Sequence, residues 1–160
     1  MSFARLDFRN ALGRFATGIC VITANPKNFE PFGMTINSFA SVSLDPPLIL
    51  WSLQKDSDCV PAFAATEHFA VNVLTQEQLL ISQHYARRGH HTLDPEHVYE
   101  GSTGLPLIKD SLVNFECEIW QRYEGGDHII LVAKVLTIKT GAVDAQPLVF
   151  FSGAYQELQQ

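Results

Sequence analysis

Apolar and polar residues alternate along several stretches of the chain, which is the pattern of half-buried β-strands. The longest such stretch is 112–123, where Phe115, Cys117 and Ile119 form an apolar face and Glu116 belongs to the opposite, polar face. The segment 124–127 contains two adjacent glycines and predicts a hairpin to a second long strand at 128–138. Shorter strands are predicted at 19–24, 32–37, 41–44, 48–53, 68–74 and 147–152.

A different periodicity predicts two or three helices. The first has apolar residues at the i, i+3, i+4, i+7 spacing, namely Phe8, Ala11, Leu12 and Phe15. Gly18 is expected to end this helix as its C-terminal cap. Thr75 and Gln78 form a capping box, which predicts a helix over 76–86. A short helix is expected to follow the polar loop 55–58 and to reach Phe63.

Many antiparallel strands with few helices predict a mainly β protein built on a barrel rather than a doubly wound sheet. At 160 residues the chain is expected to be one domain, 1–160. The segment 87–105 has glycine, histidine and proline without a period, which predicts a long loop. The core is expected to include Phe39, Phe63, Phe69, Phe115 and Phe150.

Composition narrows the class of protein. The net charge of −6 argues against a nucleic-acid partner and against an anionic membrane surface. No apolar run approaches transmembrane length, and none near the N-terminus indicates a signal peptide. The three cysteines show no paired spacing, which favours reduced thiols and a cytoplasmic location.

The segment 33–43 has an unusual density of short hydrogen-bonding side chains next to predicted strands. These side chains belong to Thr35, Asn37, Ser38, Ser41 and Ser43. They suit the edge of a flat, polar-rimmed ligand, because short donors and acceptors approach a ring without covering it. The same side chains also suit a turn-rich strand crossing in which each hydroxyl bonds locally. From the residues alone, both interpretations stay open.

Three segments together resemble the short-chain flavin reductases. The run from Thr35 to Ser43, followed by the double proline at 46–47, is similar to the family segment that borders the flavin. Gly126-Asp127-His128 is similar to its Gly-Asp-His segment, and 147–155 is similar to its closing strand. The resemblance extends from about Phe8 to Tyr155.

Membership of this family implies a fold and an activity. The fold is the FMN-binding split barrel, an antiparallel Greek-key barrel that forms homodimers with flavin near the subunit boundary. The activity is hydride transfer from NADH or NADPH to FMN or FAD. The reduced flavin then diffuses to a partner monooxygenase. Since no Gly-x-Gly-x-x-Gly motif is present, a nicotinamide cofactor is expected to lie across the flavin face rather than in a Rossmann site.

The resemblance also implies roles for single residues. His128 is expected beside the nicotinamide, with Asp127 orienting it; its alternative role is a hydrogen bond that fixes the hairpin. Lys55, Ser57 and Arg87 are candidates for the flavin phosphate, or else solvated groups without a ligand. Arg88, next to Arg87, could reach the same anion. Tyr155 is a candidate for contact with the second substrate or for the core.

Two other functions remain open at this point. One is a non-enzymatic flavin-binding or electron-transfer protein, in which the nicotinamide groove is blocked. The other is an oxidase related to pyridoxamine phosphate oxidase, which calls for more basic residues than this chain has. No metal site is expected, because the nearby histidines show no recognised ligand spacing and suit a surface loop. These histidines are His84, His90, His91 and His97.

Overall fold

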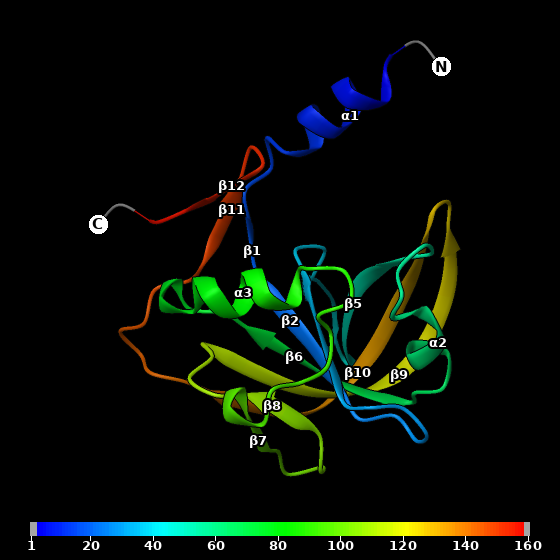
Figure 1. Ribbon diagram of the computed structural model, residues 1–160, viewed down its shortest axis with the longest axis vertical. Helices are drawn as coiled ribbons and strands as arrows, with labels where there is room; N and C mark the ends of the chain where they lie inside the picture. Colours follow the sequence, from blue (N-terminus) through cyan, green and yellow to red (C-terminus); the bar gives the residue numbers. More distant parts are fainter. Residues whose placement is uncertain (1–2, 159–160) are drawn as a thin grey trace.

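The structure, a computed structural model, describes residues 3–158. Its largest element is a seven-stranded sheet with the strand order β3-β2-β6-β9-β10-β5-β4, and every neighbouring pair is antiparallel (Figure 1). This confirms the prediction of a mainly β, antiparallel fold. The strands are β2 (Cys20–Ala24), β3 (Phe32–Ile36), β4 (Ala40–Leu44), β5 (Pro47–Gln54), β6 (His68–Val73), β9 (Val113–Gly125) and β10 (His128–Thr140).

The connection between β3 and β4 explains why the sheet curls. These strands are the two opposite edges of the sheet, yet only residues 37–39 separate them in the chain. The four Cα–Cα steps from Ile36 to Ala40 span about 14 Å at most, so the two edges must come close together. The link is fixed to β5, because the Ser52 N–H donates to Ser38 Oγ at 3.0 Å. Asn37 and Ser38 therefore lie at the seam where the barrel remains open.

The hairpin between β9 and β10 forms as predicted, with a tight turn. Gly125 pairs with His128, which leaves only Gly126 and Asp127 in the turn. Gly126 has φ 71°, a left-handed conformation that glycine adopts without strain. His128 also pairs with Gln54, the last residue of β5. The turn thus holds His128 beside the end of a neighbouring strand.

The first helix stands away from the barrel (Figure 1). It is α1 (Arg5–Leu12), and none of its residues is buried. The prediction that Gly18 ends it is wrong, because Gly13 is its C-cap and Gly18 belongs to a strand. That strand pairs with the C-terminal hairpin in a three-stranded sheet, and this pairing requires extended backbone at Gly18. The small sheet consists of β1 (Thr17–Gly18), β11 (Val149–Phe151) and β12 (Ala154–Gln156).

The remaining predicted helices, over 76–86 and up to Phe63, are also present. The capping box is present, since the Thr75 N–H donates to Gln78 Oε1 at 3.0 Å. The predicted helix over 76–86 begins with a 3₁₀ turn, η1 (Gln76–Gln78), and continues as α3 (Leu79–Tyr85). The short helix reaching Phe63 is α2 (Val60–Ala64).

The prediction of one long loop over 87–105 is only partly right. This segment contains a 3₁₀ turn, η2 (Pro95–His97), and a strand, β7 (Val98–Glu100). The strand pairs with β8 (Pro106–Ile108) in a two-stranded sheet. A three-residue strand has too few positions to show a period, so its sequence alone does not predict it. The strand is recognised only by its pairing with β8.

Aromatic side chains fill the barrel interior. Trp51, Phe63 and Phe69 are at most 2% exposed and meet edge to face. This confirms the core positions of Phe63 and Phe69. The other predicted core residues, Phe39, Phe115 and Phe150, are partly buried and pack against the buried clusters. Within residues 3–158, no helix is long and apolar enough to cross a membrane.

The three cysteines are free and buried. Burial raises the pKa of Cys20 and of Cys117 to about 12, so both are neutral thiols. They lie in β2 and β9 and behave as small core residues, as the sequence predicts.

Glu116 contradicts the simple alternation of faces along β9. The sequence places it on a polar, solvent-facing side, yet it is 3% exposed. The loop 101–104 covers this part of the strand, and Ser102, Thr103 and Thr137 donate hydrogen bonds to the carboxylate. Burial alone would raise the pKa of Glu116, but these hydrogen bonds outweigh it and lower the pKa to about 2.

Candidate functional site

A groove of about 400 Å³ opens at the seam of the barrel. Its walls come from the end of β3, the link 37–39, the end of β5 with the segment 56–58, and the end of α3. His91 and His128 complete the lining from two further segments. The volume lies within the range of small-molecule sites, and most of the lining groups are polar.

Five of the residues predicted for the site line this groove. They are Thr35, Asn37, Ser38, Ser57 and His128. They come from four different segments, so the fold brings them together from positions as far apart as β3 and the β9–β10 turn. Three of the five, Thr35, Asn37 and Ser38, belong to the polar run, so part of this run borders the groove.

Hydrogen bonds fix several of these side chains. Thr35 Oγ1 donates to the carbonyl oxygen of Ser82 on α3 at 2.6 Å. Ser38 Oγ accepts the Ser52 N–H, and Ser57 Oγ accepts the Cys59 N–H at 3.2 Å. These bonds hold the hydroxyl oxygens in place along the wall. The Asn37 side chain is exposed and provides both a donor and an acceptor.

Apart from Arg88, the other predicted residues lie outside the lining of this groove, among the residues that the structure describes. Ser41 and Ser43 are on β4, where they pair with the first half of β5. Lys55 is hydrogen-bonded to Glu124 on the neighbouring hairpin and is not part of the groove lining. Arg87 is exposed after α3. Tyr155 bonds Ser82 Oγ with its hydroxyl at 2.9 Å and packs against a buried cluster.

His128 is held from one side of its ring. Its Nδ1 lies 2.7 Å from Asp127 Oδ1, so Nδ1 donates to the carboxylate. In the neutral ring this leaves Nε2 as a hydrogen-bond acceptor. The hydrogen bond and the charge of His128 lower the pKa of Asp127, to which the Arg5 guanidinium at 3.7 Å also contributes. The predicted orienting contact of Asp127 is thus present.

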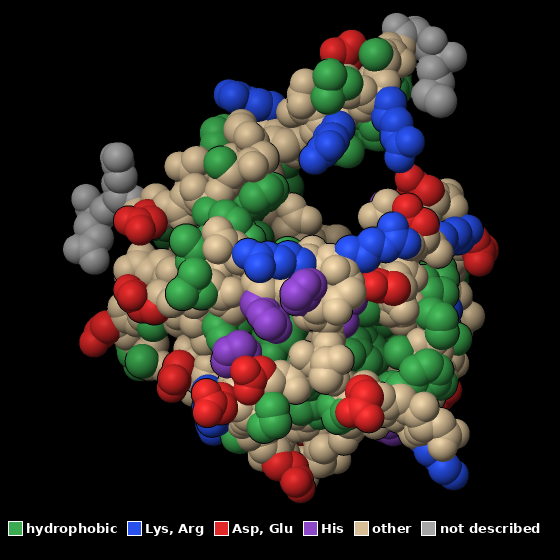
Figure 2. Space-filling view, viewed as in Figure 1, with side chains coloured by type: hydrophobic (Ala, Val, Ile, Leu, Met, Phe, Trp, Pro, Cys, Tyr) green, Lys and Arg blue, Asp and Glu red, His purple; other side chains and the backbone are tan. Residues whose placement is uncertain are grey.

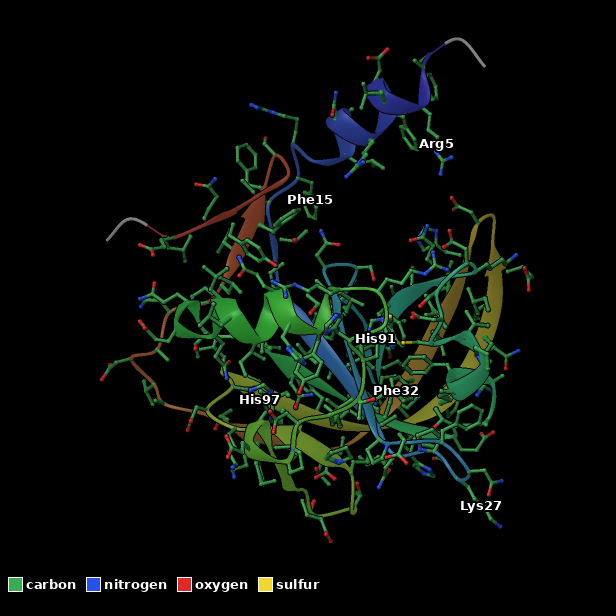
Figure 3. All side chains as sticks on the ribbon, in the orientation of Figure 1. Arg5, Phe15, Lys27, Phe32, His91 and His97 are labelled. Carbon is green, nitrogen blue, oxygen red and sulfur yellow. The ribbon has the colours of Figure 1, made fainter. Side chains whose placement is uncertain are left out.

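The structure decides between two neighbouring candidates, Arg87 and Arg88, and adds His91, which the sequence interpretation missed. Arg88 lines the groove in place of its neighbour Arg87, and its guanidinium donates to the Asp56 carbonyl oxygen at 3.1 Å. His91 was assigned to a surface loop, yet its side chain is only 14% exposed and lies beside the barrel (Figure 3). No local spacing identifies either residue, because adjacent residues in a non-periodic segment can point in any direction.

The residues present fit a flavin. A flavin ring needs donors for its carbonyl oxygens and an acceptor for its N3–H, and the Asn37 amide offers both types of group. The Arg88 guanidinium has further N–H groups beyond the one bonded to Asp56, which suits a phosphate. His128, which pairs with Gln54 at the end of β5, also lines the groove.

Comparison with known proteins gives consistent results. The flavin reductase-like domain matches residues 12–159. An FMN reductase (NADH), SmoA, of Agrobacterium fabrum is 45% identical over 149 residues, which cover 93% of this chain and 83% of that protein.

Two solved structures share the fold along nearly their whole length. One is the NADH:FAD oxidoreductase of Streptomyces globisporus in complex with NAD and FAD fragments, with a TM-score of 0.90 and 35% identity, covering 97% of this chain and 93% of that one. The other is the styrene monooxygenase flavin reductase of Pseudomonas putida, with a TM-score of 0.87 and 32% identity, covering 96% and 98%. The predicted split barrel is confirmed by these neighbours, and the chain belongs to the flavin reductase-like family.

Proposed function

We propose that this protein is an NADH-dependent flavin reductase that uses FMN or FAD. The groove at the barrel seam is the observation that carries this proposal, because its lining combines several short polar side chains with the hairpin histidine His128. NADH rather than NADPH is favoured by the naming of the similar proteins as NADH-dependent enzymes.

The chain's own residues bind and orient, since no nucleophile is required. Bound flavin supplies the hydride-accepting ring, so the protein's contribution is alignment and electrostatics. In our proposal Asn37 and the hydroxyls of Thr35 and Ser38 hold one edge of the ring. Ser57 and Arg88 bind the phosphate-bearing tail. His128, fixed by Asp127, holds the nicotinamide with Nε2.

The proposed user of the product is a monooxygenase. The reductase of styrene monooxygenase in Pseudomonas putida has this fold, which supports the same division of labour here. The reduced flavin would reach its partner by diffusion. The cytosol is the proposed location, and the three free thiols support it.

A homodimer is the proposed assembly, with α1 as part of the interface. No residue of α1 is buried, and its apolar side chains Leu6, Phe8 and Leu12 are each more than half exposed. Phe15, just after the helix, is 79% exposed and lies near the C-terminal hairpin (Figure 3). Contiguous exposed apolar side chains of this kind mark interaction sites. A pocket lined by α1 also includes Asn37, so a second copy on α1 would adjoin the flavin groove.

The substitution Leu12→Asp should convert a dimer into a monomer without unfolding it, because Leu12 has no buried contact within the chain to lose. Sedimentation velocity would measure the mass, and circular dichroism would check the fold. The control is Leu80→Asp on α3, which is 78% exposed and should leave the dimer intact. A wild-type protein that sediments as one chain would refute the assembly. A monomer from Leu80→Asp alone would instead place the interface on α3.

The test of the activity is NADH oxidation with added FMN or FAD, followed by the loss of NADH absorbance. We expect turnover within the ordinary enzyme range of about 1–10³ s⁻¹. Flavin binding without NADH oxidation would favour the non-enzymatic alternative. Absence of flavin binding at micromolar concentration would refute both functions.

A matched pair of variants tests the proposed flavin edge within the same experiment. Asn37→Ala should weaken flavin binding by roughly tenfold, the value of one or two lost hydrogen bonds. Ser43→Ala belongs to the same run but lies outside the groove, so it should leave the affinity unchanged. The affinity follows from the quenching of flavin fluorescence. Equal effects of the two substitutions would contradict the proposed edge.

A further inference from the structure

A cluster of three potential metal ligands lies at the outer side of the groove wall. The carboxylate of Asp58, the thiol of Cys59 and a ring nitrogen of His91 lie within 4.8 Å of one another. Asp58 and Cys59 precede α2, whereas His91 follows α3, so the cluster joins two segments that are distant in sequence. Figure 3 marks His91 near Phe32 of β3, at the point where these segments meet.

The hydrogen bonds of His91 leave an unusual arrangement. Its Nδ1 lies 3.0 Å from the Gly33 carbonyl oxygen, and its Nε2 lies 3.1 Å from Asp58 Oδ1. Both partners are acceptors, but a neutral imidazole has only one N–H. If Nδ1 donates to Gly33, then the lone pair of Nε2 faces a carboxylate oxygen. In that tautomer, a metal ion between these two atoms would be bound by both.

The surroundings match those of a metal ligand set. A ligating histidine usually donates its second N–H to a carbonyl or carboxylate, and the Gly33 carbonyl oxygen, 3.0 Å from Nδ1 of His91, can accept such a bond. The second oxygen of Asp58 accepts the Gly89 N–H at 3.0 Å, which fixes the carboxylate. A pocket of about 230 Å³, lined by all three candidate ligands, provides an entry path from outside. Ligand identity, outer-shell support and access are the criteria for such a site.

We propose that Asp58, Cys59 and His91 bind a zinc ion. One thiolate, one imidazole and one carboxylate form a borderline-soft set that suits Zn²⁺, with water in the fourth position. Tetrahedral zinc places its ligand atoms about 3.3–3.8 Å apart, so small side-chain rotations close the present cluster around the ion.

Zinc binding would release the proton of the Cys59 thiol and would link two segments of the chain. Burial raises the pKa of the Cys59 thiol to about 11, so the thiol is neutral at pH 7 and zinc must displace its proton to water. Two of the ligands, Asp58 and His91, also line the flavin groove. The ion would therefore link the segments 58–59 and 89–91 within the wall shared by the groove and the outer pocket.

The test uses the full chain with metal ions alone, without flavin or NADH, so its outcome is independent of the proposed reductase activity. Wild-type protein should bind one Zn²⁺ per chain in competition with a chromophoric chelator, and zinc should raise the thermal midpoint. Co²⁺ in place of zinc should give a thiolate-to-metal charge-transfer band. His91→Gln and Cys59→Ser should each weaken zinc binding by roughly tenfold or more.

Matched controls separate this cluster from other groups that bind zinc. His90→Gln removes the adjacent exposed histidine, and Cys117→Ser removes another buried thiol; both should bind zinc like the wild type. Figure 2 shows further histidines gathered on the surface near α3. If His90→Gln weakened binding as much as His91→Gln, those surface histidines would be the ligands and the proposal would be wrong.

If Cys59→Ser failed to fold, zinc binding by Asp58→Asn and the cobalt band of the wild type would decide whether this cluster binds the metal. A protein that binds no zinc, or cobalt without a thiolate band, would identify the cluster as an ion pair only.

Discussion

The substitution His128→Ala is expected to lower kcat/KM for NADH by about 10- to 100-fold, while the flavin dissociation constant changes less than about twofold. The reason is geometric. His128 lines the groove from the β9–β10 hairpin, whereas the proposed flavin edge is on the link after β3. Removing the imidazole should therefore affect the nicotinamide and leave the groups that hold the ring in place. Stopped-flow measurement of flavin reduction would separate nicotinamide binding from hydride transfer.

Two further variants define the role of the imidazole. Asp127→Asn replaces the carboxylate that orients Nδ1 and should give a smaller loss than His128→Ala. His68→Ala removes an exposed histidine at the start of β6 and should leave the kinetics unchanged. Equal losses of NADH turnover and flavin affinity in His128→Ala would assign this residue to the fixing of the hairpin instead.

The substitution Glu116→Gln is expected to lower the free energy of unfolding at pH 7 by about 2–4 kcal/mol. The carboxylate is 3% exposed and accepts hydrogen bonds from the backbone N–H groups of Ser102 and Thr103, at 3.0 Å and 2.8 Å. Their hydroxyls and that of Thr137 donate to it as well. An amide replaces one acceptor oxygen by an NH₂ group that faces donors, so some of these buried groups lose their partner. Chemical denaturation would measure the difference.

The pH dependence of this difference has a definite sign. The pKa of Glu116 is lowered in the folded protein, from an ordinary value of 4.5 to about 2. Its contribution is thus fully present above about pH 4.5 and is lost as the pH falls toward 2. The wild type should accordingly exceed Glu116→Gln in stability at neutral pH, and the gap should narrow in acid. A gap that stayed constant down to low pH would contradict the assignment.

Glu118→Gln is the matched control for this prediction. Glu118 lies two residues further along β9 and is exposed. Its neutralisation should change the free energy of unfolding by at most about 0.5 kcal/mol. The comparison isolates the effect of the loop 101–104, because both substitutions make the same chemical change on the same strand. Similar values for the two variants would mean that the buried hydrogen bonds contribute no stability.

Local patterns were sufficient for most of the fold. Alternating positions and short apolar runs predicted the strands of the large sheet, and the capping box of Thr75 and Gln78 predicted the start of the helical segment before α3. The glycines at 125–126 predicted the hairpin that carries His128. These features depend on neighbours in sequence, so their physical causes can be read from the chain. The resemblance to a known family added the barrel type, which the similar structures confirm.

Local patterns were not sufficient to predict which residues line the groove. Thr35, Asn37 and Ser38 line the groove, while Ser41 and Ser43 in the same run do not. The difference arises because the chain turns at the link 37–39 and then follows β4 along β5, away from the seam. The sequence shows that these side chains are short and polar, but their direction depends on which edge of the sheet each segment joins.

The sequence by itself determined the mainly β class, the hairpin with His128 and the polar run that resembles the flavin reductases. Each of these features depends on the spacing of nearby residues or on a continuous motif. The tertiary structure alone decided that Arg88 rather than Arg87 lines the groove, that His91 meets Asp58 and that Glu116 is buried under a distant loop. These contacts join residues up to 33 positions apart, as His91 and Asp58 are. No local period specifies such pairs, because closure of the barrel and the packing of loops upon it determine them.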